Sequence, residues 1–332
     1  MQVKTKIYPL IVGLIITFFL FAPVETIAQS AQSSFSVTPI YPSQQANDVT
    51  GYYDLTVKKG EEIALHFSLR NPSDKDIVIT NTISPATTNK NGQIIYGPSK
   101  TALHSSAKYN LADFIEGPKE TTVPANAATD LVLHLHAPDD AFEGILLGGI
   151  EFEQAHEQSD TQTIQNIVAY DIPILLRQTT QEVPLSLTFD KLDTSMLSDK
   201  QLLVQTIYNS TPTLAKKGSI VTEIRNQDSN DVVYKESNDE VNFAPNATMA
   251  FDISLQDQPL SAGNYTAKTT VQFGDKKWET TDSFKLAKPI ERTNAPSNLV
   301  TNTPKKVIYP LIILVLLIII VALLYKTRKT KT

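Results

Sequence analysis

The stretch EIALHFSLR, residues 62–70, places a large apolar side chain at every second position. This period of two is typical of a β-strand with one buried face and one solvent-facing face. The stretch is followed by Asn71-Pro-Ser-Asp74, a cluster of residues that favour turns. Residues 62–70 therefore predict a half-buried strand that ends at a tight turn.

The same alternation recurs along the chain. Further examples are Leu131, Leu133 and Leu135; Leu185, Leu187 and Phe189; Met249, Phe251, Ile253 and Leu255; and Tyr265, Ala267, Thr269, Val271 and Phe273. Between the two terminal apolar segments, no stretch keeps a helical period for more than about three turns. The predicted fold class is all-β.

Two parts of the chain resemble each other. The segment that begins at Pro124 is similar to the one at Pro245, and their asparagines Asn126 and Asn246 are 120 residues apart. Later glycine and phenylalanine markers keep nearly the same offset, and a strand ending at Asn71 matches one ending at Asn209. We expect two tandem immunoglobulin-like β-sandwiches, residues 29–180 and 181–287, with the boundary at the polar residues 178–183. Chance similarity between β-rich stretches is the alternative.

The N-terminus has the pattern of a secretory signal. Lys4 and Lys6 precede an apolar run over residues 7–21, and Thr26-Ile-Ala28 fits a cleavage site. Residues 1–28 are therefore predicted to be removed during export.

The C-terminus predicts a membrane anchor. Residues 307–325 contain no charged side chain, and as a helix they would extend about 28 Å, close to the thickness of a bilayer core. The basic tail, residues 326–332, fits a cytoplasmic end, and residues 288–306 form a polar linker. We expect a single-pass membrane protein with an extracellular N-terminal ectodomain and a cytoplasmic C-terminus. Covalent attachment to the wall is the alternative, although no LPxTG-type motif precedes the span.

Composition narrows the partners. Of the 29 Lys and Arg, two lie in the signal and four in the tail, whereas only Glu25 of the 35 Asp and Glu is removed, which leaves about −11 on the exported part. This charge disfavours nucleic acid and anionic lipid surfaces as partners. Cysteine is absent, so packed cores must supply the stability and no thiol chemistry is available.

No motif for catalysis, cofactor binding or metal binding stands out. His134 and His136 share a strand face but lack an adjacent third ligand, and the acidic loops lack the spacing of calcium loops. Gly144, Gly148 and Gly149 lie in an apolar strand, where they indicate either a bulge or a groove for a ligand chain. We expect no catalytic residue, no metal and no cofactor.

An Asn-Gly turn gives the clearest candidate for a ligand site. Asn91-Gly92 predicts a β-hairpin over residues 87–96, and loops on a rigid sandwich often carry binding sites. The candidate ligand-binding residues are Thr88, Asn89, Asn91 and Tyr96, whose hydroxyls, amides and ring suit sugar or peptide groups. A hairpin kept only for its turn geometry is the alternative. The glycine-containing strand at residues 144–150 is the next candidate site.

Several segments resemble the WxL-interacting proteins of low-GC Gram-positive bacteria. They are PATTNKNGQIIY at residues 85–96, FEGILLGGI at 142–150, FAPN at 243–246 and SAGNY at 261–265, together with Trp278. The resemblance implies a first domain that binds peptidoglycan, a second that binds host extracellular matrix proteins, and WxL-domain surface proteins as partners. It brings no catalytic residues.

These observations predict a membrane-anchored cell-surface scaffold that binds WxL-domain proteins and peptidoglycan. The alternative from another class is an ecto-enzyme that hydrolyses cell-wall polysaccharide through paired carboxylates, whose separation in space a sequence does not give.

Overall fold

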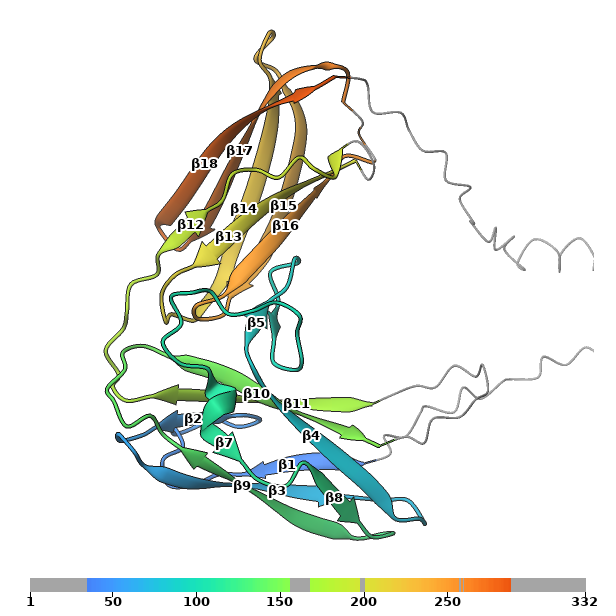
Figure 1. The fold of residues 1–332 in the computed structure, drawn as a ribbon, viewed down its shortest axis with the longest axis vertical. Helices are drawn as coiled ribbons and strands as arrows, with labels where there is room; N and C mark the ends of the chain where they lie inside the picture. The colour runs from blue at the N-terminus through green and yellow to red at the C-terminus, as the bar shows by residue number, and fades with distance from the viewer. Residues whose placement is uncertain (1–34, 156–167, 198–200, 257, 259, 288–332) are drawn as a thin grey trace, which may run out of the picture.

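The computed structural model describes residues 35–155, 168–197, 201–256, 258 and 260–287. The named regular elements in these residues are β-strands and one short 3-10 helix (Figure 1). The all-β prediction is therefore confirmed. The signal at residues 1–28, the linker at 288–306, the apolar segment at 307–325 and the tail at 326–332 lie outside the described residues. Within the described residues, no helix has the length and hydropathy needed to cross a membrane.

The first sandwich packs two sheets face to face. One sheet has the order β1-β3-β9-β7 and the other the order β2-β11-β10-β4-β8, in which β2 runs parallel to β11. The strands of these sheets are β1 (Ser36–Ile40), β2 (Tyr53–Thr56), β3 (Glu62–Arg70), β4 (Ile77–Pro85), β7 (Ile115–Glu116), β8 (Glu120–Val123), β9 (Ala128–His136), β10 (Leu146–Gln154) and β11 (Ala169–Arg177).

Every second side chain of β3 is buried in the core of the first sandwich. Ile63, Leu65, Phe67 and Leu69 are buried, as the period of two predicts. The Phe67 ring meets Phe152 of the opposite sheet at 5.1 Å and Tyr53 at 5.4 Å between ring centroids. These aromatic contacts join the two layers of the first sandwich.

The second sandwich has its own core. One sheet has the order β12-β13-β16 and the other the order β15-β14-β17-β18. The strands are β12 (Leu187–Phe189), β13 (Leu202–Asn209), β14 (Ala215–Asn226), β15 (Val232–Phe243), β16 (Thr248–Ser254), β17 (Gly263–Phe273) and β18 (Lys276–Leu286). The buried residues between these sheets, including Ile220, Phe251 and Val271, form a cluster separate from the first core.

Each sandwich contains a buried corner of the same kind. Asn71 at the end of β3 and Asn209 at the end of β13 are both fully buried. The Asn71 side-chain amide donates to the carbonyls of Lys75, Val123 and Pro124, and the Asn209 amide donates to those of Thr213 and Ala244. The backbone hydrogen bonds of the two corners correspond as well. Asn71 N–H donates to the Ala127 carbonyl, and Asn209 N–H donates to the Ala247 carbonyl.

The left-handed residues that follow also correspond. Asn126 and Asn246 have φ angles of 54° and 51°, and their N–H groups donate to the carbonyls of Ser73 and Thr211. The sequence similarity around the two asparagine pairs therefore corresponds to the same hydrogen-bonded corner, formed once in each sandwich.

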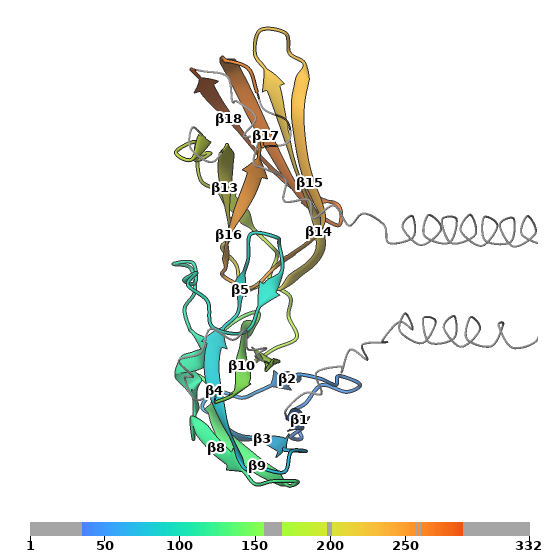
Figure 2. The same cartoon turned by 90° about the vertical axis from the view of Figure 1, so that its right-hand side faces the viewer.

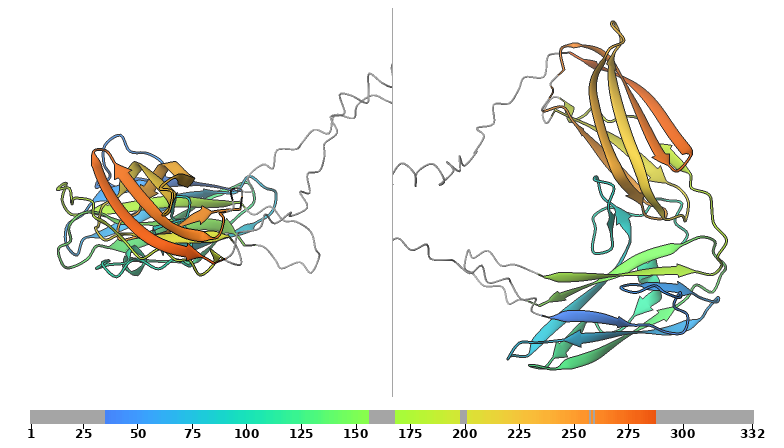
Figure 3. Two further views of the ribbon diagram at one scale, coloured as in Figure 1. Left: turned by 90° about the horizontal axis from the view of Figure 1, so that it is seen from above. Right: turned by 180° about the vertical axis from the view of Figure 1, so that it is seen from behind.

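The sandwiches follow one another end to end with a bend between them. In Figure 1 most strands of the first sandwich run across the view, whereas those of the second run upward, and Figure 2 shows the second sandwich stacked above the first. The right-hand view of Figure 3 shows that the end of β18 lies at the end of the second sandwich that is far from the first.

We predict that Asn71→Ala lowers the free energy of unfolding by about 2–3 kcal/mol, because the buried carbonyls lose their donor. Asn126→Gly, which keeps the left-handed backbone, is the matched control and should change stability by less than about 0.5 kcal/mol. Urea unfolding followed by circular dichroism measures both. Equal stability of Asn71→Ala and the wild type would show that the corner does not hold the strands.

Candidate functional site

A long connection in the first sandwich reaches the second. We call residues 86–110, between β4 and the 3-10 helix η1 (Leu111–Phe114), the docking arm. It contains the short hairpin β5 (Thr87–Thr88) and β6 (Ile94–Ile95), which lies between the sandwiches in Figures 1 and 2. The hairpin predicted over residues 87–96 is confirmed, and Gly92 has a left-handed φ of 70°. Its turn is centred on Lys90 and Asn91, because Gly92 N–H donates to the Asn89 carbonyl at 3.0 Å, and Asn91 is not left-handed.

The tip of the arm pairs with the β15 end of the second sandwich. The Gly92 carbonyl accepts from Asn242 N–H at 2.7 Å, and the Asn91 carbonyl accepts from the Asn238 side-chain amide at 2.8 Å. Thr88 Oγ1 accepts from Ala244 N–H at 3.0 Å in a buried position. The arm therefore satisfies backbone donors of β15 and of the residue that follows it.

A second part of the arm binds the corner of the second sandwich. His104 N–H donates to the Asn246 carbonyl at 2.8 Å, and the Asn246 side-chain amide donates to Ser106 Oγ at 2.7 Å. The His104 ring lies 4.9 Å from the Tyr208 ring, centroid to centroid. The corner motif, which occurs once in each sandwich, is therefore the attachment point for the arm in the second sandwich.

An apolar cluster lies between these two attachments. Its buried members are Ala86, Leu147, Leu175, Ala244 and Ala247, from both sandwiches. Tyr96 packs against this cluster and against Gly149, where an added Cβ would lie 2.7 Å from Tyr96 Cβ. A small apolar interface therefore supports the hydrogen bonds of the arm.

The glycine-containing strand has no bulge, and other parts of the same chain lie against two of its glycines. Pairing of β10 with β11 runs without a register shift from Leu146 to Glu153. Tyr96 occupies the space above Gly149, and a side chain on Gly144 would collide with the Pro212 carbonyl. Ile145 N–H also donates to that carbonyl at 2.8 Å. The glycines permit close approach of other parts of the same chain.

The residues predicted to bind a ligand make contacts within this chain. Thr88 is 2% exposed and Tyr96 is part of the interface cluster. Asn89 Oδ1 accepts from the N–H groups of Asn91 and Gln93, so its side chain shapes the turn. The ligand-binding role of Thr88, Asn89, Asn91 and Tyr96 stays a prediction, and a ligand that used the Thr88 hydroxyl would have to replace its contact with Ala244 of the second sandwich.

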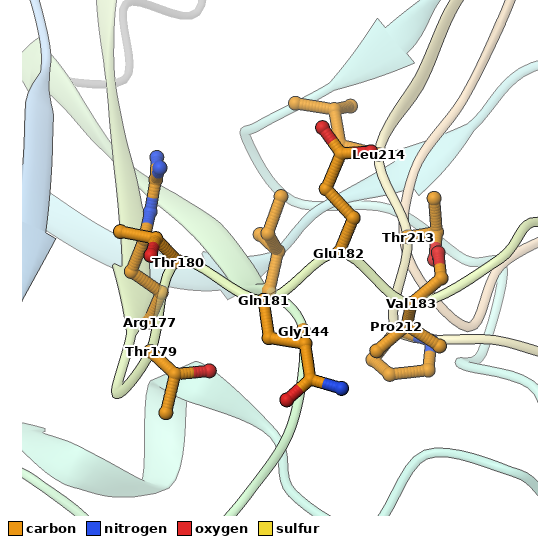
Figure 4. A pocket seen from close by; sticks show the side chains of 11 residues that line it. Gly144, Arg177, Thr179, Thr180, Gln181, Glu182, Val183, Pro212, Thr213 and Leu214 are labelled. Carbon is orange, nitrogen blue, oxygen red and sulfur yellow. The ribbon is translucent and has the colours of Figure 1, made fainter.

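One cavity lies beside residues 178–183, the segment that connects the two sandwiches. It has a volume of about 300 Å³ and is lined by Gly144, Arg177, Gln181, Glu182 and Pro212, among others (Figure 4). The side chains of Gln181 and Glu182 point to opposite sides of this connecting segment in Figure 4. The guanidinium of Arg177 donates to Asp54, so this cation is already paired.

A second cavity lies on another side of the Ile145 and Pro212 contact. We call it the Tyr109–Phe142 groove; it has a volume of about 270 Å³, and its walls are mainly apolar. Tyr109, Phe142 and Glu143 come from the first sandwich, and Pro212 and Asn246 come from the second. Clefts at domain boundaries that combine apolar walls with a few polar groups are common ligand sites.

A carboxylate pair lies near the base of the arm. Glu151 and Asp171 are cross-strand partners on β10 and β11. Burial raises the pKa of both carboxyl groups, and the neighbouring charge of Asp171 raises that of Glu151 further. A Cβ on Gly97 would lie 2.7 Å from Glu151 Oε2, so the arm covers this pair closely. Neither acid lines the two junction cavities.

Metal ligation has no support in the described residues, where no group of three His, Cys, Asp or Glu side chains is placed to hold an ion. His136 instead lies 3.5 Å from Glu62 and 3.6 Å from Asp139, in exposed positions. His66 lies 3.1 Å from Asp130 on the same sheet. These histidines lie in exposed surface contacts, His136 with two carboxylates and His66 with one.

Solved structures with a similar chain path are distant. They include the class 5 fimbriae chaperone CfaA, 12% identical over 75% of this chain and 98% of that chain with a TM-score of 0.32. The E. coli chaperone DraB is 9% identical, over 76% and 97%, with a TM-score of 0.29. No curated protein sequence matches the chain.

Two family profiles match most of the described chain. Residues 35–154 match the peptidoglycan binding domain of WxL Interacting Protein, and residues 159–295 match its host binding domain. Together they cover more than half of the sequence, and both describe binding domains of a surface scaffold. The chain belongs to the WxL-interacting protein family.

Proposed function

We propose that this chain is a rigid two-domain adaptor, in which the docking arm fixes the peptidoglycan-binding sandwich against the host-binding sandwich. The observation that carries this proposal is the set of hydrogen bonds from the arm to Asn242, Ala244 and Asn246. Interfaces between domains of one chain usually allow relative motion unless specific contacts prevent it. Here hydrogen bonds from the arm to three backbone groups of the second sandwich, together with an apolar cluster, oppose that motion.

The folding units differ slightly from the matched domains. Strand β11 lies inside the host-binding match, yet it pairs with β10 and β2 of the first sandwich. We place the domain boundary at residues 178–183, after β11 and before β12. A fragment that ended at residue 154 would lose β11 from its sheet and expose β10.

Membrane attachment through residues 307–325 is part of this proposal, and its support is the uncharged span with its basic tail. The last described strand, β18, ends far from the first sandwich (Figure 3). An anchor that follows β18 would therefore place the host-binding sandwich nearer the membrane and the peptidoglycan-binding sandwich further into the wall. WxL-domain proteins would bind to the same ectodomain without covalent chemistry.

Binding without turnover is the first expected result. The full chain, purified in detergent, should sediment with purified peptidoglycan and release neither reducing ends nor soluble muropeptides. Boiled chain serves as the control for nonspecific adsorption. Released products in proportion to incubation time would favour the ecto-enzyme that acts on cell-wall polysaccharide.

Protease treatment tests the anchor. Protease added to protoplasts should degrade everything except a fragment of a few kilodaltons that contains residues 307–332. The reason is that only the span and its tail would be shielded by the membrane. Protection of the large ectodomain fragment would show that the orientation is wrong.

Thr88→Val tests the arm. Valine keeps the shape but removes the acceptor for Ala244 N–H, which should cost about 1–3 kcal/mol at the junction. Amide exchange at Asn242 and Ala244 should then rise about tenfold or more, while exchange in the core strands stays unchanged. Thr101→Val, at an exposed position on the same arm, is the matched control. Unchanged exchange in Thr88→Val would mean that the arm does not hold the sandwiches together.

A further inference from the structure

The Tyr109–Phe142 groove has the composition of a sugar-binding surface. Its rings are held in place, because Tyr109 makes edge-to-face contacts with Phe114 at 5.5 Å and with Phe142 at 6.3 Å between centroids. Phe142 N–H donates to Gln178 Oε1 at 3.1 Å, which fixes the loop that carries the second ring. Preformed aromatic surfaces lose little conformational entropy when a ligand binds.

Charge in the groove is balanced. Lys108 and Glu143 are the charged residues among those that line it. The Lys108 ammonium lies 4.8 Å from the Tyr109 ring centroid and 3.8 Å from an Asp140 oxygen, so it already has partners. A strongly charged ligand would need an excess of one sign, which this groove does not offer. The composition favours a neutral, polar ligand.

Polar and apolar groups face the same space. The side chains of Ser106 and Asn246, which are hydrogen-bonded to each other at 2.7 Å, supply a hydroxyl and an amide. Ile145 and Pro212 supply an apolar wall. An N-acetylated amino sugar presents matching groups, namely hydroxyls, an acetamido N–H and C=O, a methyl group and the apolar face of its ring. A free peptide chain would present charged ends or side chains in addition.

We propose that the Tyr109–Phe142 groove binds N-acetylated amino sugar residues of the wall glycan. This assignment rests on the proposed peptidoglycan-binding function and names the part of peptidoglycan that is recognised. Most of the groove belongs to the segment that matches the peptidoglycan binding domain, whereas Pro212 and Asn246 belong to the second sandwich. Bound glycan therefore contacts both sandwiches and stabilises their docked arrangement.

The test uses the full chain in detergent and tetra-N-acetylchitotetraose as a soluble probe, followed by calorimetry. Ala141→Phe places a ring in the groove from an exposed position and should raise the Kd about tenfold or more. Ala128→Phe, at an exposed position on β9, is the matched control and should bind as the wild type does. Equal binding by all three proteins, or no binding of the probe by the wild type, overturns the proposal.

Peptidoglycan sedimentation separates this proposal from the function on which it rests. Loss of sedimentation in Ala141→Phe alone supports the groove. Sedimentation of Ala141→Phe at the wild-type level would place the peptidoglycan site elsewhere, with the binding function intact. A wild type that does not sediment would contradict the binding function itself. Circular dichroism melting curves within about 2 °C of the wild type would show that each variant is folded.

Discussion

The arrangement of the two sandwiches depends on backbone hydrogen bonds between the arm and the β15 region. Strand β15 is the outermost of its sheet in the described residues, so its free backbone groups need partners or water. The arm supplies the Gly92 carbonyl and Thr88 Oγ1 to Asn242 and Ala244. Because these donors are backbone groups, the contact depends little on which side chains β15 carries. The hairpin thus protects a sheet edge and joins two domains at once.

The same corner has different roles in the two sandwiches. Asn71 and Asn209 each hold the ends of neighbouring strands through a buried amide. In the first sandwich the corresponding Asn126 is exposed. In the second, the Asn246 carbonyl accepts from His104 N–H of the arm, and the Asn246 side-chain amide donates to Ser106 Oγ. A corner with a fixed backbone is a good docking point, because binding does not have to order it.

The groove proposed to bind sugar draws its residues from both sandwiches. The Tyr109–Phe142 groove takes its rings from the first sandwich and its Asn246 amide from the second. A ligand in the groove would therefore strengthen the contact that the arm makes, by linkage between binding and docking.

The sequence alone determined the strands, the turn and the repeat. Alternation in residues 62–70 and the Asn-Gly turn are local signals, and local backbone preference is enough to predict a strand and a hairpin from them. The partner of that hairpin was not predictable, because Ala244 meets Thr88 across 156 residues of chain. Tyr109, Phe142 and Asn246 likewise come from three distant segments that no motif connects. Only the tertiary structure brought these groups together, since packing of two separate cores decides which loops face each other.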